Sequence, residues 1–293
     1  MIVLGFDTST PATAVGLRLD DGRKFEARDD PTVDRRPGHA TRLLPLAQGL
    51  LEEASLGWEQ LGRIAVGVGP GTFTGLRIGI ATARGLAQSL EVELVAVSSP
   101  RALVYEAQER RAKWTCGESD ECGNDNRTDG ASGIDKWSEA AVRVGLLAVV
   151  DARRGEVFVA AYEGERELAG PQARAPTEIG ELLGRLAASS GIEQWLAVGD
   201  GAVRYRDALD HPGVVVPDSR SSPHRIQASA ICELGMRASC DGIPVLPDYR
   251  RRPDAEIALE KRAPSPASKV ASAGTPAAES AAVSDIEPKR AAS

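Results

Sequence analysis

The segment Gly67-Val68-Gly69-Pro70-Gly71-Thr72-Phe73-Thr74-Gly75-Leu76-Arg77-Ile78-Gly79 decides how the first half of this chain folds. It follows an apolar run at residues 64–68 and leads into an apolar helical pattern at residues 76–90. This order predicts a strand, a tight glycine-rich turn and a long helix, with Thr72 and Thr74 as candidate N-cap residues. The turn points backbone N–H groups and a helix N-terminus outward. It can therefore receive a phosphate or pack closely against another backbone.

Small residues recur every four positions along this helix, at Gly75, Gly79, Ala83 and Ala87. A stripe of small side chains lets another helix approach closely, either within the chain or from a partner. Another helix, predicted at residues 39–55, carries leucines at helical spacing that include Leu43, Leu46 and Leu50. We expect the small and apolar faces of the two helices to form a contact surface for a second protein, with internal packing as the alternative.

The N-terminus predicts three strands, at residues 2–6, 12–19 and 23–27, the last two joined by the hairpin turn Asp20-Asp21-Gly22. The first strand ends in Asp7-Thr8-Ser9-Thr10. An acidic residue followed by hydroxyls can contact a phosphate or a metal-bound water. The same residues also favour a simple side-chain-capped turn.

Strands and helices alternate through the rest of the chain, which predicts an α/β sheet covered on both faces. Strands are expected at residues 62–68, 93–97, 142–150, 156–162 and 194–198, and helices at residues 99–109, 177–188 and 225–238. The strand at residues 194–198 ends in Gly199-Asp200-Gly201, which could receive an adenosine or begin a helix.

Composition narrows the function classes. The chain has 293 residues, with 42 acidic and 35 basic side chains and a formal net charge of −7. This balance argues against a protein whose main task is gripping nucleic acid. No apolar run is long enough to span a bilayer and no signal peptide is apparent, so we expect a cytoplasmic protein without a membrane partner. The four cysteines lack zinc-knuckle spacing.

Five segments in a fixed order resemble the TsaB (YeaZ) family. They are Asp7-Thr8-Ser9-Thr10, residues 39–45, residues 69–79, Ala96-Val97-Ser98-Ser99 and Asp151-Ala152-Arg153-Arg154-Gly155-Glu156-Val157. The resemblance runs from Met1 to about residue 250 with one interruption. It implies an actin/hexokinase-like (ASKHA) fold of two related halves. It also implies a role in forming N6-threonylcarbamoyladenosine at position 37 of tRNAs that read codons beginning with A.

The resemblance also defines a domain division. Residues 1–109 would form the first half, 140–222 the second, and 223–252 a C-terminal helix and closing segment that packs back on the first half. Residues 110–139 are polar and nearly free of apolar side chains around 115–136, so we expect a flexible insertion. Residues 253–293 are rich in Ala, Ser and Pro, which predicts a disordered tail.

The implied partners are a TsaD-like transferase and, within the same complex, a TsaE-like ATPase. A homodimer is expected when the transferase is absent, and tRNA is reached through the complex. We assign the partner interface to His39, Leu43, Leu46, Leu50, Gly75, Arg77, Gly79, Ala83 and Ala87. For His39 the alternative is a buried residue at the helix start, and for Arg77 a solvated charge.

A bound metal is not expected. TsaD-type relatives carry a His-x-x-x-His metal motif, and alignment on the glycine-rich segment places Ser99 and Leu103 at the two histidine positions. Neither residue can replace a neutral imidazole as a ligand. The chain has three histidines, His39, His211 and His224, and no pair has ligand spacing. The family resemblance therefore predicts an accessory subunit without catalysis of its own.

The competing hypothesis is an independent actin/hexokinase-type ATPase or small-molecule kinase. Asp7 and Asp151 could supply its acidic groups. The candidate nucleotide-binding residues are Asp7, Thr8, Ser9, Gly69, Gly71, Thr72, Gly199 and Asp200. The bulky Arg153 and Arg154 disfavour a second phosphate turn. We therefore expect no tightly bound cofactor, at most weak binding of ATP or ADP, and favour the accessory subunit.

Overall fold

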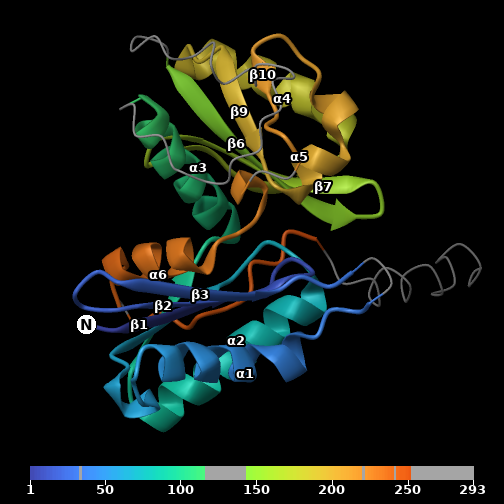
Figure 1. Cartoon of the computed structure of the whole chain (residues 1–293). Coiled ribbons are helices and arrows are strands. Elements are labelled where there is room, and N and C mark those ends of the chain that lie inside the picture. Colours follow the sequence, from blue (N-terminus) through green and yellow to red (C-terminus); the bar gives the residue numbers. More distant parts are fainter. Residues whose placement is uncertain (33–34, 116–142, 220–221, 241, 252–293) are drawn as a thin grey trace, which may run out of the picture. The chain divides into compact units, whose positions relative to one another are not determined.

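The computed structural model describes residues 1–32, 35–115, 143–219, 222–240 and 242–251. Residues Met1–Arg251 form one compact unit (Figure 1). Most of the predicted insertion and the whole predicted tail lie outside the described residues. Among the helices that are described, none combines the length and the apolar character needed to cross a membrane.

The first sheet contains β1 (Val3–Asp7), β2 (Thr13–Arg18), β3 (Lys24–Asp29), β4 (Arg63–Gly67) and β5 (Glu93–Val97). Its strand order is β3-β2-β1-β4-β5. The first three strands form an antiparallel meander, and β4 and β5 add in parallel to β1. Strands β1 and β4 are buried along their whole length, as their apolar runs predict.

The second sheet repeats this pattern. It contains β6 (Val144–Arg153), β7 (Glu156–Glu163), β8 (Arg166–Arg174), β9 (Gln194–Val198) and β10 (Val214–Val215), in the order β10-β9-β6-β7-β8. Again three strands form an antiparallel meander and two add in parallel. The same topology in both sheets confirms the predicted actin/hexokinase-like fold of two related halves. Strands β8 and β10 were not predicted.

Helices cover the first sheet on both faces. Helices α1 (His39–Glu53) and α2 (Phe73–Leu90) lie on one face, and α6 (Ala228–Arg237) lies on the other, with α3 (Ser99–Thr115) beside it (Figure 1). Helix α3 runs six residues past its predicted end, so residues 110–115 belong to a helix and not to the insertion. Helix α6 begins three residues later than predicted.

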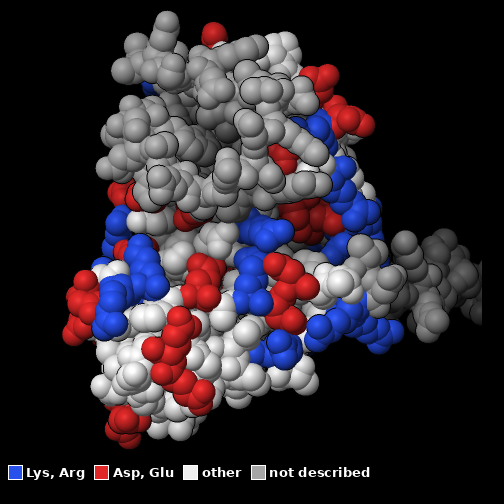
Figure 2. All heavy atoms as spheres, viewed as in Figure 1, with Lys and Arg blue, Asp and Glu red and all other residues white. Residues whose placement is uncertain are grey.

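The second sheet is accompanied by α4 (Ile179–Ser190) and α5 (Asp200–Arg204). Short 3-10 turns occur at Trp58–Gln60, Pro176–Glu178, Arg206–Leu209 and Ser222–His224. On the surface, acidic and basic side chains are interspersed over the face drawn in Figure 2. The net negative charge of the chain is therefore not collected in one region of this face.

Side chains of the first sheet hold both ends of α6. The carboxylate of Glu26 accepts hydrogen bonds from the backbone N–H groups of Ala228 (2.8 Å) and Ser229 (3.3 Å) at the start of the helix. At the other end Arg63 Nη1 donates to the carbonyl oxygens of Gly235 (2.8 Å), Met236 (3.3 Å) and Ala238 (2.9 Å). Helix ends leave four N–H and four C=O groups without helical partners, and these two side chains satisfy several of them. Helix α6 is thereby fixed to the N-terminal sheet.

Replacing Arg63 with methionine should lower the free energy of unfolding by about 2–3 kcal/mol. The carbonyl oxygens at the end of α6 would lose a charged hydrogen-bond donor in the protein interior. Arg63 is 8% exposed and also pairs with Glu93. Urea unfolding of the full chain measures the change. Arg166→Met, at a side chain that is 71% exposed, is the matched control and should change stability by less than about 0.5 kcal/mol. Equal effects of the two substitutions would contradict the proposed anchor.

Candidate functional site

The glycine-rich segment packs against the turn that follows β1. The backbone N–H of Thr72 donates to the carbonyl oxygen of Ser9 (2.7 Å), and a Cβ at Gly71 would overlap Ser9. Gly69 has φ of +93°, a conformation that favours glycine. Thr72 occupies the N-cap position of α2, but its side chain makes no capping hydrogen bond. Of the two alternatives for this turn, close backbone packing is the one the structure contains.

Asp7 is the centre of a hydrogen-bond network between three elements. Its Oδ1 accepts from the backbone N–H (2.7 Å) and the hydroxyl (2.6 Å) of Ser9, and its Oδ2 accepts from Ser99 Oγ (2.5 Å). Ser99 Oγ in turn accepts from the backbone N–H of Gly69 (3.1 Å). Asp7 is 1% exposed, and a Cβ at Gly67 would overlap its carboxylate. Asp7 therefore caps its own turn.

The small-residue stripe of α2 faces the chain's own first sheet. The hydroxyl of Thr8 donates to the carbonyl oxygen of Gly75 (2.8 Å), and a Cβ at Gly79 would overlap that hydroxyl. Ala83 and Ala87 are buried in the core with leucines of α1. These contacts correct the predicted partner interface, because Gly75, Gly79, Ala83 and Ala87 are already packed within the chain.

The predicted interface leucines of α1 and Arg77 of α2 differ in exposure. Leu43 and Leu50 are buried in the same core, and Leu46 is half-buried. Arg77 is exposed, lies over the Phe73 ring at 3.7 Å from its centroid, and donates through Nε to Tyr249 Oη (2.9 Å). Arg77 is therefore accessible at the surface and Leu46 partly so, whereas Leu43 and Leu50 are not.

The accessible faces of α1 and α2 carry residues that were not among the predicted interface residues. Leu44 is 44% exposed, and Gly49 and Gly85 are exposed helical glycines with nothing within 4 Å of an added Cβ. Ala81, one turn before Gly85, is exposed as well. We call Leu44, Gly49, Ala81 and Gly85 the outer helix face. On α2, Ala81 and Gly85 are four residues apart, the same spacing as in the buried stripe, so periodicity alone could not tell the two faces of this helix apart.

His39 lies inside the protein. It is 4% exposed, and its Nδ1 is 2.9 Å from Thr13 Oγ1. Burial lowers the pKa of His39, although the nearby carboxylates of Asp7 and Asp29 act in the opposite direction. This side chain joins the start of α1 to β2. His39 is therefore the buried residue at a helix start that was given as the alternative to a partner contact.

In the second half, Gly199 and Asp200 are tied to β6. Asp200 Oδ1 accepts from the backbone N–H of Asp151 (3.0 Å), and burial raises the pKa of Asp200. Gly199 has φ of +116°, and its N–H donates to His224 Nδ1 (3.2 Å). Gly199 and Asp200 thus begin the short helix α5. Of the two predicted roles, adenosine binding or a helix start, the structure contains the helix start.

Only one predicted nucleotide-binding residue lines the small cavity near these loops. Its volume is about 200 Å³, and it is lined by Thr10, Pro11, Ala12, Arg28, Asp30, Pro31, Asp200, His224, Arg225 and Ile226. Ligand pockets are typically about 300–1,000 Å³. The structure brings Asp7, Thr8, Ser9, Gly69, Gly71 and Thr72 together, but they pack on one another instead of lining this cavity.

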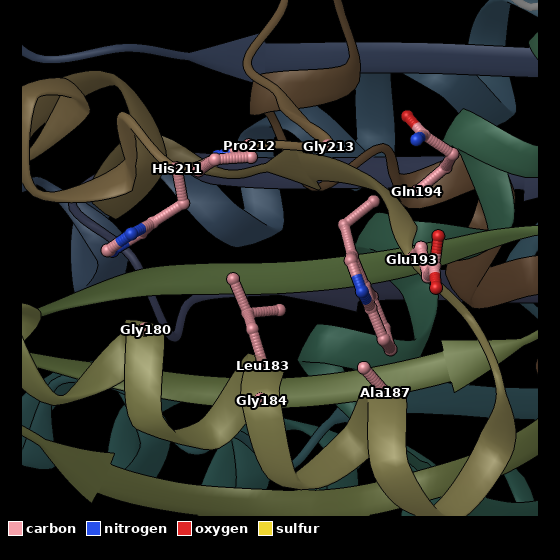
Figure 3. A pocket seen from close by; sticks show the side chains of 10 residues that line it. Gly180, Leu183, Gly184, Ala187, Glu193, Gln194, His211, Pro212 and Gly213 are labelled. Atoms are coloured by element: carbon pink, nitrogen blue, oxygen red, sulfur yellow. The ribbon is translucent and has the colours of Figure 1, made fainter.

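A second cavity, of about 410 Å³, lies between α4 and the loop before β10 (Figure 3). It is lined by Gly180, Leu183, Gly184, Ala187, Glu193, Gln194, Trp195, His211, Pro212 and Gly213. None of these residues was predicted as a site residue. In the sequence, this cavity is indicated only by the small residues Gly180, Gly184 and Ala187 along α4 and by Trp195.

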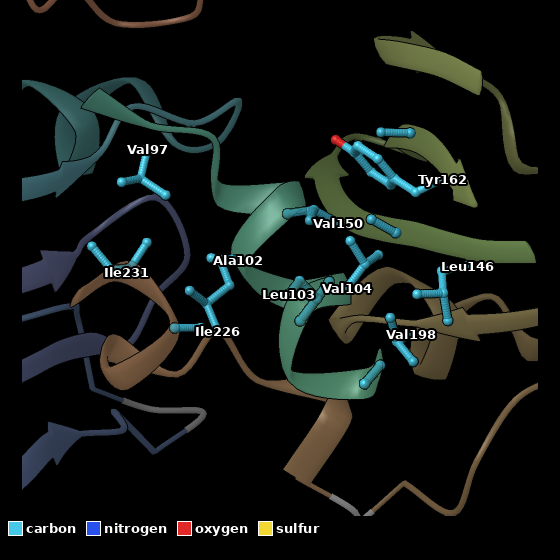
Figure 4. Packing of buried hydrophobic residues seen from close by; sticks show 14 of the residues in the cluster. Val97, Ala102, Leu103, Val104, Leu146, Val150, Tyr162, Val198, Ile226 and Ile231 are labelled. Atoms are coloured by element: carbon cyan, nitrogen blue, oxygen red, sulfur yellow. The ribbon is translucent and has the colours of Figure 1, made fainter. Parts of the chain in front are cut away.

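Neither of the two positions that align with metal ligands is available for that role. Ser99 is held in the Asp7 network, and Leu103 is 1% exposed in a cluster that includes Val150 and Ile231 (Figure 4). This cluster joins residues of both sheets through α3 and α6. Among the described residues, no group of three or more His, Cys, Asp or Glu side chains could hold a metal ion. The absence of a bound metal stays a prediction.

Replacing Ser99 with alanine should lower the free energy of unfolding by about 1–3 kcal/mol, because one oxygen of the buried Asp7 carboxylate and the N–H of Gly69 lose their partner. Chemical denaturation measures the change. Ser89→Ala, at an exposed position of α2, is the control and should change stability by less than about 0.5 kcal/mol. A stable Ser99→Ala protein would mean that the network is dispensable.

The stability of the wild-type protein should fall more steeply than that of His39→Asn as the pH drops from 7 to 5. The folded pKa of His39 lies below its ordinary value near 6.5, so the unfolded state binds more protons in this window and is favoured as the pH falls. Between pH 7 and 8 the difference between the two proteins should be constant. Unfolding free energies measured across the whole range test this, and parallel curves from pH 7 to 5 would contradict it.

Comparison with known proteins agrees with this geometry. The family described as "TsaD: tRNA N6-adenosine threonylcarbamoyltransferase" matches residues 33–114, the region of α1 to α3. The tRNA threonylcarbamoyladenosine biosynthesis protein TsaB of Escherichia coli is 29% identical over 220 residues, which are 74% of this chain and 79% of that protein. An uncharacterized protein of Mycobacterium leprae is 32% identical over 179 residues, 61% of this chain and 40% of its own length.

Among solved structures, YeaZ from Pseudomonas aeruginosa has a TM-score of 0.59 and 26% sequence identity. The match covers 85% of this chain and 99% of that one. It therefore extends over both halves of the described fold. With these relatives and the repeated five-stranded topology, the chain belongs to the TsaB (YeaZ) family, which is related to TsaD.

Proposed function

We propose that this chain is a non-catalytic, activating subunit of the complex that forms N6-threonylcarbamoyladenosine at position 37 of tRNAs reading codons that begin with A. Its E. coli relative is named for the biosynthesis of that nucleoside. The position of Ser99 and Leu103 is the observation that supports a subunit without catalysis of its own. They stand where the resemblance to TsaD puts two metal ligands, and each is committed to internal contacts. Without those ligands the chain has no group there to activate a carbonyl or a water.

The partner of this subunit would be a TsaD-like transferase, docked on the outer helix face. Gly49 and Gly85 let the backbone of another helix come close, and Leu44 supplies apolar area. A second copy of the chain would use the same face when the transferase is absent. Docking would activate the transferase by binding its competent conformation more tightly than its inactive one. A TsaE-like ATPase and the tRNA would join the same assembly.

Tight nucleotide binding is not part of the proposal. The Asp7 carboxylate already accepts three hydrogen bonds, and arginines occupy the turn between β6 and β7. An independent ATPase or kinase would need these positions for phosphate and metal. The isolated chain would therefore bind ATP or ADP weakly. The complex would bind these nucleotides better than the isolated chain does.

Reconstitution tests the function. The chain is mixed with a TsaD-like enzyme, threonylcarbamoyl-adenylate and an unmodified tRNA transcript, and the modified nucleoside is quantified. We expect modification only when both proteins are present, and negligible ATP hydrolysis by the chain alone. Full modification without this chain, or transfer by this chain with no partner, would refute the accessory role.

Gly85→Leu should abolish co-purification with the transferase and the stimulation of its activity. The added side chain meets open space in the isolated chain, so the fold should gain roughly 0.5–1 kcal/mol from losing a helical glycine. Gly184→Leu on α4 is the matched control, since it makes the same change at another exposed, open helical glycine. Normal activation by Gly85→Leu would show that the partner docks elsewhere.

A further inference from the structure

The turn between β6 and β7 holds two arginines in a backbone conformation that side chains disfavour. Arg153 has φ of +65° and Arg154 has φ of +55°, and Gly155 follows at +79°. Glycine and asparagine are the usual residues at such positions, because a Cβ crowds the backbone there. Strained positions of this kind are a sign of a functional demand on the side chain. Both side chains are exposed and can be reached by a ligand from the solvent.

Two more arginines from distant parts of the chain meet the same turn. Arg204 of α5 lies 3.3 Å from Asp151 Oδ2, and Arg153 lies 3.4 Å from the same oxygen. Arg251 donates to the carbonyl oxygen of Ala152 (2.9 Å) and lies 3.3 Å from Glu156. The Asp151 side chain is 5% exposed, whereas those of Arg153 and Arg204 are 50% and 57% exposed. Arg153 and Arg204 therefore cover Asp151 and face the solvent, whereas the Arg251 side chain is 21% exposed beside Glu156, which is 42% exposed.

An exposed aromatic ring stands close by in the chain. Tyr249, two residues before Arg251, is 42% exposed and receives a hydrogen bond from Arg77. Its ring also packs against Phe73, with 5.1 Å between the ring centroids. Two residues of extended chain span about 7 Å, so the Cα atoms of Tyr249 and Arg251 lie within about 7 Å of each other.

We propose that Arg153, Arg154, Arg204 and Arg251, together called the arginine surface, bind the phosphate backbone of RNA directly, with Tyr249 available to stack on an unpaired base. Arginine presents a planar fork that matches phosphate oxygens, and an aromatic ring beside basic groups is a common feature of single-stranded RNA sites. A free nucleoside triphosphate fits less well, because the arginine side chains occupy the turn that would have to cradle its phosphates. The natural RNA is identified as tRNA only on the basis of the proposed function.

The test compares two double variants of the full chain. Arg153→Asn with Arg154→Asn removes two charges and places a residue that tolerates positive φ, so the melting temperature should not fall. Arg23→Asn with Arg185→Asn removes two exposed charges elsewhere and is the matched control. Binding of an unmodified tRNA transcript is measured by fluorescence anisotropy between 50 and 200 mM salt. The turn variant should bind several-fold more weakly, and its log–log salt slope should fall by roughly 0.7–0.9 for each phosphate that the turn no longer neutralises.

Three results would overturn the inference. The first is no tRNA binding by the wild-type chain at 50 mM salt, and the second is identical salt slopes for the turn variant and the control. The third is displacement of tRNA by millimolar ATP together with arginine-dependent ATP binding, which would make this surface a nucleotide site. Binding of the transferase is measured on the same proteins. Since tRNA binding is measured without the transferase, a failure to bind the transferase would refute the proposed function and leave this inference standing.

Discussion

The hydroxyl of Ser99 is the contact on which the first half of the molecule depends. It donates to the Asp7 carboxylate at the end of β1 and accepts from the N–H of Gly69, so one side chain joins a strand end, a glycine-rich loop and the start of a helix. Buried polar groups are costly unless they are paired, and here each satisfies the other. Without this hydroxyl, Asp7 Oδ1 would keep its two hydrogen bonds from Ser9, but Oδ2 and the N–H of Gly69 would lose their partner.

The second organising element is α6, which is far from the first sheet in sequence and central to it in space. Glu26 and Arg63 hold its two ends, and its apolar side chains share a core with α3 and with strands of the second sheet. Each half also has an apolar core of its own, and the shared cluster packs the two halves together at their boundary.

Much of the fold could be predicted from the sequence, because apolar runs and glycine turns are local signals. The glycine-rich segment and the N-terminal meander both appear where the sequence indicates, whereas Leu43, expected at the partner interface, lies in the core. The faces of α2 were not readable, because Gly75 and Gly85 are both small, and only the three-dimensional neighbourhood of Thr8 separates the buried from the open glycine. His39 posed the same problem, since its partner is 26 residues away in sequence. Strand β10 has two residues, too few for any periodicity.

The contact between Thr8 and Gly79 links two positions that lie far apart in the sequence. A Cβ at residue 79 would occupy the space of the Thr8 hydroxyl, and that hydroxyl is itself committed to the carbonyl of Gly75. Any larger residue at position 79 therefore requires a smaller one at position 8 and a new partner for the freed carbonyl. Across related sequences these sites should change as a linked pair. The two positions are not independent, because the side chains at 8 and 79 compete for the same space.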